Sequence, residues 1–246
     1  MTDEHKLTKK ERRELKKQEW QEKAEREKRN ALFKKAGIIV GVILVVVISI
    51  VGLIKLAGSS GLTSSSEINI PPISKNDITK GDPKSKIALI EYSDFQCPAC
   101  AAYYPLTKRL LSEFGDKIYF AYRMFPLSTI HKNAIISAQA GYAAHKQGKF
   151  FEMEDYLFTK QTEWAELSDP TTAFTDYAKL LKLDVNKFKA DMNSGEAKNY
   201  VANSQNQASS IGINSTPSFF VNGGRIINPR SYDDFKKIIQ DELNKK

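Results

Sequence analysis

Residues 92–100 read YSDFQCPAC and contain both cysteines of the 246-residue chain. The stretch begins inside an apolar, β-branched run, KIALIEYS at residues 86–93, which predicts a strand covered on both faces. A helix is expected from Pro98 to about residue 114, because a proline in the first helical turn loses no hydrogen bond. Pro105 lies deeper in this helix and predicts a kink. The pattern places Cys97 at the helix N-terminus and Cys100 one turn further on.

Two cysteines in this position predict thiol–disulfide chemistry. Unpaired N–H groups and the positive end of the helix dipole favour a thiolate at Cys97, so this sulfur attacks or is attacked. Cys100 is more shielded and resolves the mixed disulfide. An inert structural disulfide and half of a zinc site are the alternatives. Zinc would also need His131 and His145, whose separation of 14 residues differs from the usual spacing of about three to five, so no metal site is predicted.

The elements that follow this motif predict an α/β fold with a helical insert. Residues 117–125, KIYFAYRMF, predict a second strand. Residues 127–210 contain no strand-like alternation and favour several helices, with starts expected at Asp169-Pro170 and at Asp184.

The C-terminal part of the chain predicts a hairpin and a last helix. The hairpin covers residues 217–228 and turns at residues 222–224, Asn-Gly-Gly. Ser231 and Asp234 resemble a capping box, so a helix is expected from residue 232 to about residue 243. Strand, C-x-x-C helix, strand, helical insert, hairpin and helix together make a thioredoxin fold with an inserted helical subdomain at about residues 127–210.

An apolar run near the N-terminus predicts a single transmembrane helix before this domain. Residues 37–54, GIIVGVILVVVISIVGLI, carry no charge. At about 1.5 Å per residue, residues 36–57 can cross a hydrocarbon core of roughly 30 Å. Eight Lys and Arg lie within residues 16–35 against two after the span, Lys55 and Lys75, which predicts a cytoplasmic N-terminus and an extracytoplasmic domain at the cell membrane. A cleaved signal peptide and a buried core helix are the alternatives.

Charge and composition divide the rest of the chain. Residues 1–35 carry 13 basic and 8 acidic side chains and predict a charged cytoplasmic tail. Residues 58–76 contain much Ser and Gly and predict a linker, so the folded domain is expected at residues 77–246. Residues 58–246 carry 23 basic and 21 acidic side chains, a balance that predicts no nucleic-acid partner.

From about Ile78 to the C-terminus, the chain resembles the DsbA-like family of extracytoplasmic thiol–disulfide oxidoreductases, particularly its membrane-anchored bacterial branch. Four stretches carry the resemblance, and the first and last are the most specific. They are residues 92–100 (YSDFQCPAC), 122–127 (YRMFPL), 147–151 (QGKFF) and 212–223 (GINSTPSFFVNG). The resemblance implies a thioredoxin fold with an inserted helical subdomain. It also implies redox chemistry at Cys97 and Cys100, with no cofactor beyond their own disulfide.

The active-site motif Cys97-Pro98-Ala99-Cys100 departs from the family at one position. The strongest oxidants of the family carry a histidine where this chain has Ala99. The Cys97 thiolate therefore lacks a cationic partner, and the disulfide is expected to be a weaker oxidant, at about 1.4 kcal/mol for each ~30 mV of potential.

Glu91 and the Thr216–Pro217 pair complete the predicted site. Glu91 stands where the family has a buried acid, and burial would raise its pKa and allow it to relay a proton for Cys100. An exposed edge position is the alternative for Glu91. The resemblance also implies a cis peptide bond between Thr216 and Pro217, where free backbone groups can pair with an extended substrate. A trans proline that starts an edge strand is the alternative there.

These features together predict a membrane-anchored enzyme that forms or exchanges disulfides in exported, cysteine-containing proteins. Oxidase, isomerase and reductase activities stay open, with oxidase favoured. A membrane redox partner is expected to recycle the Cys97–Cys100 pair. A non-catalytic chaperone or copper-binding module that uses the same two thiols is the alternative from a different class.

Overall fold

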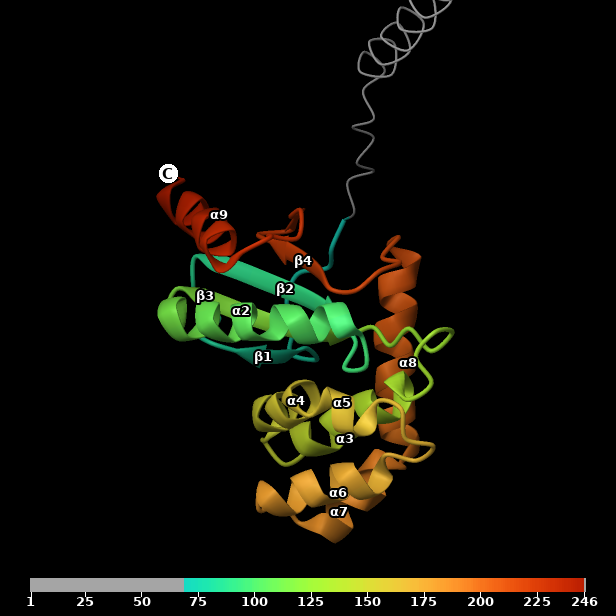
Figure 1. Ribbon diagram of the computed structural model, residues 1–246. Helices are drawn as coiled ribbons and strands as arrows, with labels where there is room; N and C mark the ends of the chain where they lie inside the picture. Colours follow the sequence, from blue (N-terminus) through green and yellow to red (C-terminus); the bar gives the residue numbers. More distant parts are fainter. Residues whose placement is uncertain (1–68, 246) are drawn as a thin grey trace, which may run out of the picture. The chain divides into compact units, whose positions relative to one another are not determined.

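The computed structural model describes residues 69–245 (Figure 1). They contain a five-stranded sheet in the order β1-β3-β2-β4-β5, in which β2 and β3 are parallel and all other neighbours are antiparallel. The strands are β1 (Ile78–Lys80), β2 (Ile87–Ser93), β3 (Ile118–Met124), β4 (Ser218–Val221) and β5 (Gly224–Arg225). The strands predicted at residues 86–93 and 117–125 are confirmed as the central pair, β2 and β3. Strand β1 pairs with the outer edge of β3, and β4 pairs with the outer edge of β2.

Two helices flank the sheet in the way the sequence predicts. Helix α2 (Pro98–Phe114) follows β2 with Pro98 in its first turn and contains Pro105. Helix α9 (Tyr232–Asn244) packs against α2 and begins after Ser231, whose hydroxyl accepts the N–H of Asp234 at 3.1 Å. The predicted N-cap at Ser231 and the helix start are therefore confirmed, and this bond is one of the two that make up a capping box.

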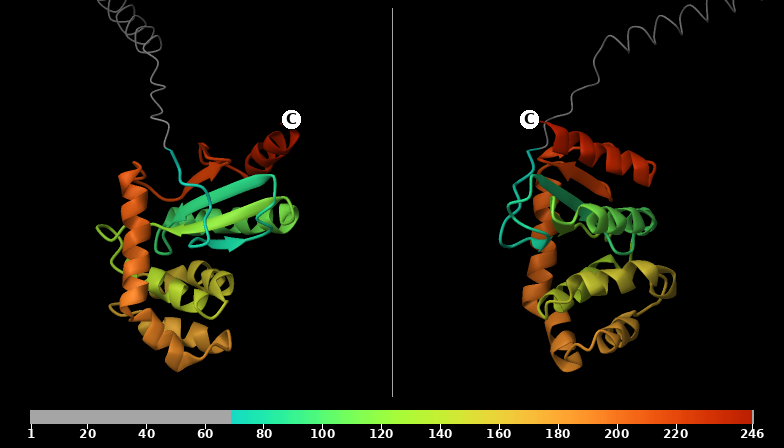
Figure 2. Two further views of the ribbon diagram at one scale, coloured as in Figure 1. Left: turned by 180° about the vertical axis from the view of Figure 1, so that it is seen from behind. Right: turned by 90° about the vertical axis from the view of Figure 1, so that its left-hand side faces the viewer.

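A helical insert separates β3 from β4. Its helices are α3 (Ala134–His145), α4 (Phe150–Thr159), α5 (Gln161–Trp164), α6 (Thr171–Leu180), α7 (Val185–Met192) and α8 (Gly195–Ser210). Helix α7 starts where predicted, because the Asp184 carboxylate accepts the Lys187 N–H at 2.9 Å. Helix α8 returns from the insert and contacts β3, as both views of Figure 2 allow the reader to follow.

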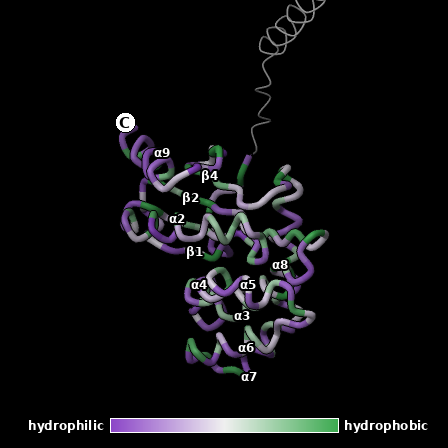
Figure 3. Tube along the Cα trace, in the orientation of Figure 1, coloured by the Kyte–Doolittle hydropathy of each residue, from purple (hydrophilic) through white to green (hydrophobic). Residues whose placement is uncertain are grey.

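The two faces of the sheet bury separate apolar clusters. Strand β2 alternates between them: Leu89 points into the larger cluster, which includes α2 and the insert, while Ile90 and Tyr92 point into the smaller one. Figure 3 shows the outer helices α8 and α9 as predominantly hydrophilic. The alternation also fixes the side of Glu91, which shares the face of Leu89 and lies beneath α2.

The N-terminal predictions lie mostly outside the described residues. These are the charged tail at residues 1–35, the transmembrane helix at residues 36–57 and the linker as far as residue 68. Between residues 69 and 245, no helix combines the length and apolar character that a membrane span requires. The described end of the linker packs on the domain: Ile70 is 6% exposed, and the Pro72 carbonyl accepts from Arg123 Nη2 at 3.1 Å.

Candidate active site

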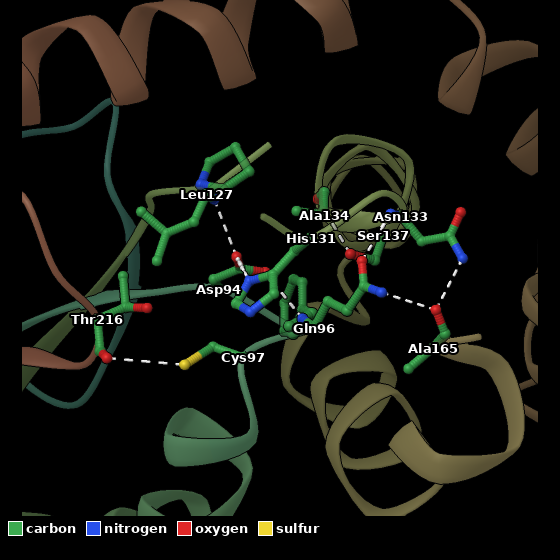
Figure 4. A network of polar contacts seen from close by, with 12 residues as sticks. Asp94, Gln96, Cys97, Leu127, His131, Asn133, Ala134, Ser137, Ala165 and Thr216 are labelled. Atoms are coloured by element: carbon green, nitrogen blue, oxygen red, sulfur yellow. Dashed lines mark hydrogen bonds and ion pairs between the residues drawn. The ribbon is translucent and has the colours of Figure 1, made fainter. Parts of the chain in front are cut away.

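Cys97 caps the N-terminus of α2, at the end of a short loop after β2. Its carbonyl accepts the N–H of Ala101 at 3.1 Å, and its side chain is 7% exposed. Across the site, the Cys97 Sγ lies 3.7 Å from the Thr216 carbonyl oxygen (Figure 4). The Thr216–Pro217 peptide bond is cis. Chain folding therefore brings together two predicted parts of the site that are 119 residues apart.

The two sulfurs differ in protonation. The pKa of Cys97 is lowered from 9.0 to about 5, chiefly because the Cys100 thiol donates a hydrogen bond to the Cys97 sulfur. Burial opposes this shift, while the Thr216 side chain and the N–H groups of Ala99 and Cys100 add to it. Burial raises the pKa of Cys100 well above its ordinary value, and the neighbouring Cys97 raises it further. Helix N–H groups and a thiol thus stabilise the thiolate without a cation at Ala99.

The loop that carries Cys97 is held by the buried Asp94 carboxylate. Its Oδ1 accepts the N–H of Gln96 at 2.8 Å, and its Oδ2 accepts the N–H of Leu127 at 2.9 Å. The same Oδ2 lies 2.7 Å from Nδ1 of His131, and the Asp94 carbonyl accepts the Cys97 N–H at 3.1 Å (Figure 4). Residues 94–97, the active-site loop from here on, are therefore fixed by hydrogen bonds to the side chain and the main-chain carbonyl of Asp94.

The helical insert holds the active-site loop from the other side. Gln96 Nε2 donates to the Ala165 carbonyl at 2.7 Å, and Gln96 Oε1 accepts the Asn133 N–H at 2.6 Å. Gln161 Nε2 donates to the carbonyls of Phe95 and Cys97 at 2.7 and 3.0 Å. The insert thus positions the nucleophilic cysteine through two glutamines, a contact that no local pattern of the sequence indicates.

Glu91 is buried at 2% exposure in the central strand, so its alternative assignment to an exposed edge is wrong. Burial raises its pKa from 4.5 to about 7, against smaller opposite effects of the Ser93 and Thr107 hydroxyls. A carboxyl group with this pKa can exchange protons near neutral pH. The proton relay itself stays a prediction.

Glu154 is a second buried acid, and the sequence reasoning missed it. Helix α4 buries an apolar stripe with spacing i, i+3, i+7 and i+8, formed by Phe150, Met153, Leu157 and Phe158. Glu154 occupies the i+4 position of that stripe and is 7% exposed. A carboxylate at a core position of an amphipathic helix was the available signal.

The two remaining histidines of the domain do not gather with the cysteines. His131 pairs with Asp94, and His145 ends α3 beside the ring of Tyr142. In the part of the chain that the structure describes, no three His, Cys, Asp or Glu side chains form a metal-binding group.

The fold and the site together define a protein of the thioredoxin superfamily. A family model described as Thioredoxin matches residues 74–241. Among curated proteins, "Probable disulfide bond formation protein D" of Bacillus cereus is 32% identical over 174 residues, covering 67% of this chain and 78% of that protein. This chain belongs to the DsbA-like thiol–disulfide oxidoreductase family of that superfamily.

Two further similarities show how much of the chain is shared with other proteins. "Na(+)/H(+) antiporter NhaA 1" of Mycobacterium sp. (strain KMS) is 34% identical over 155 residues, which is 61% of this chain but 24% of the antiporter. The chain thus spans about a quarter of the length of such relatives. The crystal structure of α-DsbA1 from Wolbachia pipientis superposes with a TM-score of 0.63 at 22% identity, over 71% of this chain and 94% of that one. This likeness concerns the fold.

Proposed function

We propose that this chain is a membrane-anchored, extracytoplasmic thiol–disulfide oxidoreductase that forms or exchanges disulfides in exported proteins through Cys97 and Cys100. The observation that carries the proposal is the opposite protonation of two neighbouring sulfurs. Cys97 has a pKa of about 5, whereas the pKa of Cys100 is raised well above its ordinary value. Disulfide exchange needs a thiolate that attacks and a second, protonated thiol that resolves the mixed disulfide.

The reaction proceeds by two sulfur transfers. In the oxidising direction, a substrate thiolate attacks Sγ of Cys97 in the Cys97–Cys100 disulfide, and Cys100 leaves with the electron pair and takes up a proton. A second substrate thiolate then attacks the substrate sulfur of the mixed disulfide, and Cys97 leaves as a thiolate. The substrate has lost two electrons and gained a disulfide, and the enzyme holds two reduced cysteines.

The low pKa of Cys97 favours the oxidase over the isomerase and the reductase. A stabilised thiolate stabilises the reduced enzyme, and this makes the disulfide form a better oxidant. At Ala99 the chain lacks a cation that would add to this effect, so backbone N–H groups and the Cys100 thiol supply the stabilisation.

Thr216 and Pro217 form the proposed substrate-binding position. The Thr216 carbonyl faces Cys97, and Pro217 has no N–H group that would compete for the sulfur. An extended substrate segment can pair with the Thr216 backbone as an added strand and so bring its cysteine to Cys97.

The membrane anchor is part of the proposal. Residues 36–57 form the span, with the tail at residues 1–35 in the cytoplasm and the domain outside, where a membrane redox partner reoxidises the cysteines. Protease added to intact cells should digest the domain and spare the tail. A Cys97 region protected from protease would contradict this orientation.

Single-cysteine variants test the catalytic part. Cys97→Ser should abolish disulfide exchange, whereas Cys100→Ser should leave Cys97 able to attack and should accumulate mixed disulfides with substrate proteins. Mixed disulfides through Cys100, or exchange that survives Cys97→Ser, would contradict the proposal. Tight binding of Cu(I) without thiol exchange would instead favour the binding-module alternative.

A further inference from the structure

The Glu154 carboxyl group of α4 has no role in the mechanism above. Glu154 is 7% exposed and lines a surface pocket, and among the described residues no hydrogen-bond or ion-pair partner of its carboxyl group is found. A buried carboxylate without a partner destabilises a fold, and an apolar side chain at this position would pack against Phe150 and Leu157 at lower cost. This position therefore calls for a chemical explanation.

Three buried hydroxyl groups surround the two acids. Ser93 Oγ, Thr107 Oγ1 and Tyr122 OH are inaccessible to solvent and have no hydrogen-bond partner of normal geometry within the described chain. Together with Glu91 and Glu154 they form what we call the buried polar cluster. Buried hydroxyls are ordinarily partnered, so three unpartnered ones around two carboxyl groups are an unusual concentration.

Two of these hydroxyls connect the acids to their surroundings. Ser93 and Glu91 are two residues apart on β2 and therefore share the face of the sheet beneath α2. The Ser93 side chain lowers the pKa of both Cys100 and Glu91, in line with this position between them. The Thr107 side chain faces Glu91, and the same residue lines a surface pocket together with Glu154. Cys100, Ser93, Glu91, Thr107 and Glu154 thus form a series of polar groups from the sulfur to the pocket, in which the two hydroxyls make no hydrogen bond of normal geometry within the described chain.

The series ends at solvent. The pocket that Thr107 and Glu154 line has a volume of about 570 Å³, and the exposed Lys80 and Lys108 lie at its wall. Glu154 is consequently the titratable member of the buried polar cluster that lines this pocket, together with Thr107.

Charges from several elements act on Glu154. Burial and the charge of Glu91 raise its pKa well above the ordinary value, and two lysines oppose this. Because ionised Glu91 disfavours ionisation of Glu154, the pair retains a proton near neutral pH. The titratable and charged groups that act on Glu154 are Lys80 of β1, Glu91 of β2, Tyr104 and Lys108 of α2, Tyr122 of β3 and Asp155 of α4.

We propose that Glu154 is the outer member of a proton path that connects Cys100, through Ser93, Glu91 and Thr107, to the pocket at Lys80 and Lys108. The inference deepens the proposed function, because it requires disulfide exchange at Cys97 and Cys100. Because Glu154 lies in α4, the inference gives the helical insert a role in proton transfer to and from Cys100.

The step balances as follows when the reduced enzyme resolves a mixed disulfide. The Cys100 thiol gives its proton to the Ser93 oxygen as the Ser93 proton passes to Glu91. The Cys100 sulfur attacks Sγ of Cys97, the Cys97–Cys100 bond forms, and the substrate sulfur leaves as a thiolate. Glu154 releases a proton to the pocket and regains one from Glu91 through the Thr107 hydroxyl, which accepts one proton and passes on its own. When the enzyme oxidises a substrate, the same path runs inward and protonates the departing Cys100.

Pre-steady-state oxidation of the reduced enzyme by glutathione disulfide separates the two chemical steps. Acid quenching and mass spectrometry measure mixed-disulfide formation at Cys97 and then release of glutathione by Cys100. Glu154→Gln should leave the first step unchanged and slow the second by about tenfold or more near neutral pH, the usual scale for loss of a proton-transfer group. Glu154→Asp, which keeps a carboxyl group, should recover part of the rate.

Glu152→Gln is the matched control, because Glu152 lies on the same helix and is exposed beside Lys149 at 2.7 Å. It should change neither step. In infrared spectra near neutral pH, Glu154→Gln should remove one protonated-carboxyl band, and Glu152→Gln should remove none.

Three outcomes would overturn the inference: equal slowing of both steps, a pH profile of Glu154→Gln that matches that of Glu152→Gln, or a Glu154 that is ionised near neutral pH. Failure of the wild-type protein to form the mixed disulfide at all would instead overturn the proposed function.

Discussion

The active-site loop and the buried polar cluster both adjoin the two active-site cysteines, and they differ in how their polar atoms are partnered. In the loop, Asp94 accepts two backbone N–H groups and contacts His131, and Gln96 both donates and accepts. In the cluster, the hydroxyls of Ser93, Thr107 and Tyr122 have no hydrogen-bond partner among residues 69–245. Both regions are buried, so solvent does not explain the difference.

We infer from this difference that the two regions have different functions. Hydrogen bonds of Asp94 and Gln96 fix the loop that carries Cys97 at the helix N-terminus, where the Cys100 thiol and backbone N–H groups keep the Cys97 sulfur ionised. Unpartnered hydroxyls and two raised carboxyl pKa values lower stability, and they leave groups beneath Cys100 that can take up and release protons. If this comparison is right, removing a polar group from the loop should lower the free energy of unfolding strongly. Removing one from the cluster should change it little or raise it above neutral pH.

The largest effect is expected in the loop. Asp94→Ala should lower the free energy of unfolding by about 3–5 kcal/mol, because two backbone donors and His131 lose a buried anionic partner. Urea denaturation at neutral pH measures this loss. Asp82→Ala is the control, since the exposed Asp82 accepts one N–H, from Lys84 at 2.9 Å. Equal losses of stability in the two variants would contradict the claim that Asp94 fixes the active-site loop.

The second effect concerns pH and the buried polar cluster. The pKa of Glu91 is raised from 4.5 to about 7 in the folded protein, so the unfolded chain releases this proton first as the pH rises. Stability should fall between pH 4.5 and 7, by about 3 kcal/mol from this group, and level off above. Glu91→Gln should remove that part of the fall and should be the more stable protein above pH 7.

This comparison is best made on the disulfide form, in which neither cysteine titrates. Unfolding free energies are measured across the pH range for the wild type and for Glu91→Gln, and one curve is subtracted from the other. A difference that does not change with pH would mean that Glu91 titrates normally.

The smallest effect is a difference in stability between phenylalanine variants of two buried tyrosines, one on β2 and one on β3. Tyr122→Phe should change stability by less than about 1 kcal/mol, because its hydroxyl has no partner to lose. Tyr92→Phe removes the hydroxyl that accepts from Arg123 Nη1 at 2.8 Å and should cost about 1–3 kcal/mol. If Tyr122→Phe is the more damaging of the two, the cluster hydroxyls are partnered in solution.

Local patterns predicted the framework of the domain correctly. The β-branched runs gave β2 and β3, and Asp184 and Ser231 each cap a helix as expected. These features depend on residues close in sequence, whose preferences act before tertiary packing. The C-x-x-C motif likewise placed Cys97 at the start of α2.

The features that the sequence did not predict all depend on distant contacts. Strand β1 has three residues and is defined by its pairing with β3. Gln161 contacts the Cys97 carbonyl across 64 residues, and no neighbour of Gln161 in the sequence indicates this. Glu154 was recognisable by its position in an apolar stripe, but its proximity to Glu91 follows from the packing of α4 against the sheet.

A pH titration of Cys97 in the reduced protein tests the central claim most directly, which is that the Cys100 thiol and the first N–H groups of α2 hold Cys97 as a thiolate beside a protonated Cys100. The rate of alkylation at Cys97, located by mass spectrometry, reports the thiolate fraction at each pH. The rate should rise with a midpoint at a pKa of about 5, and Cys100 should stay unmodified. A midpoint near the ordinary cysteine pKa of 9.0, or faster alkylation of Cys100 than of Cys97, would contradict it.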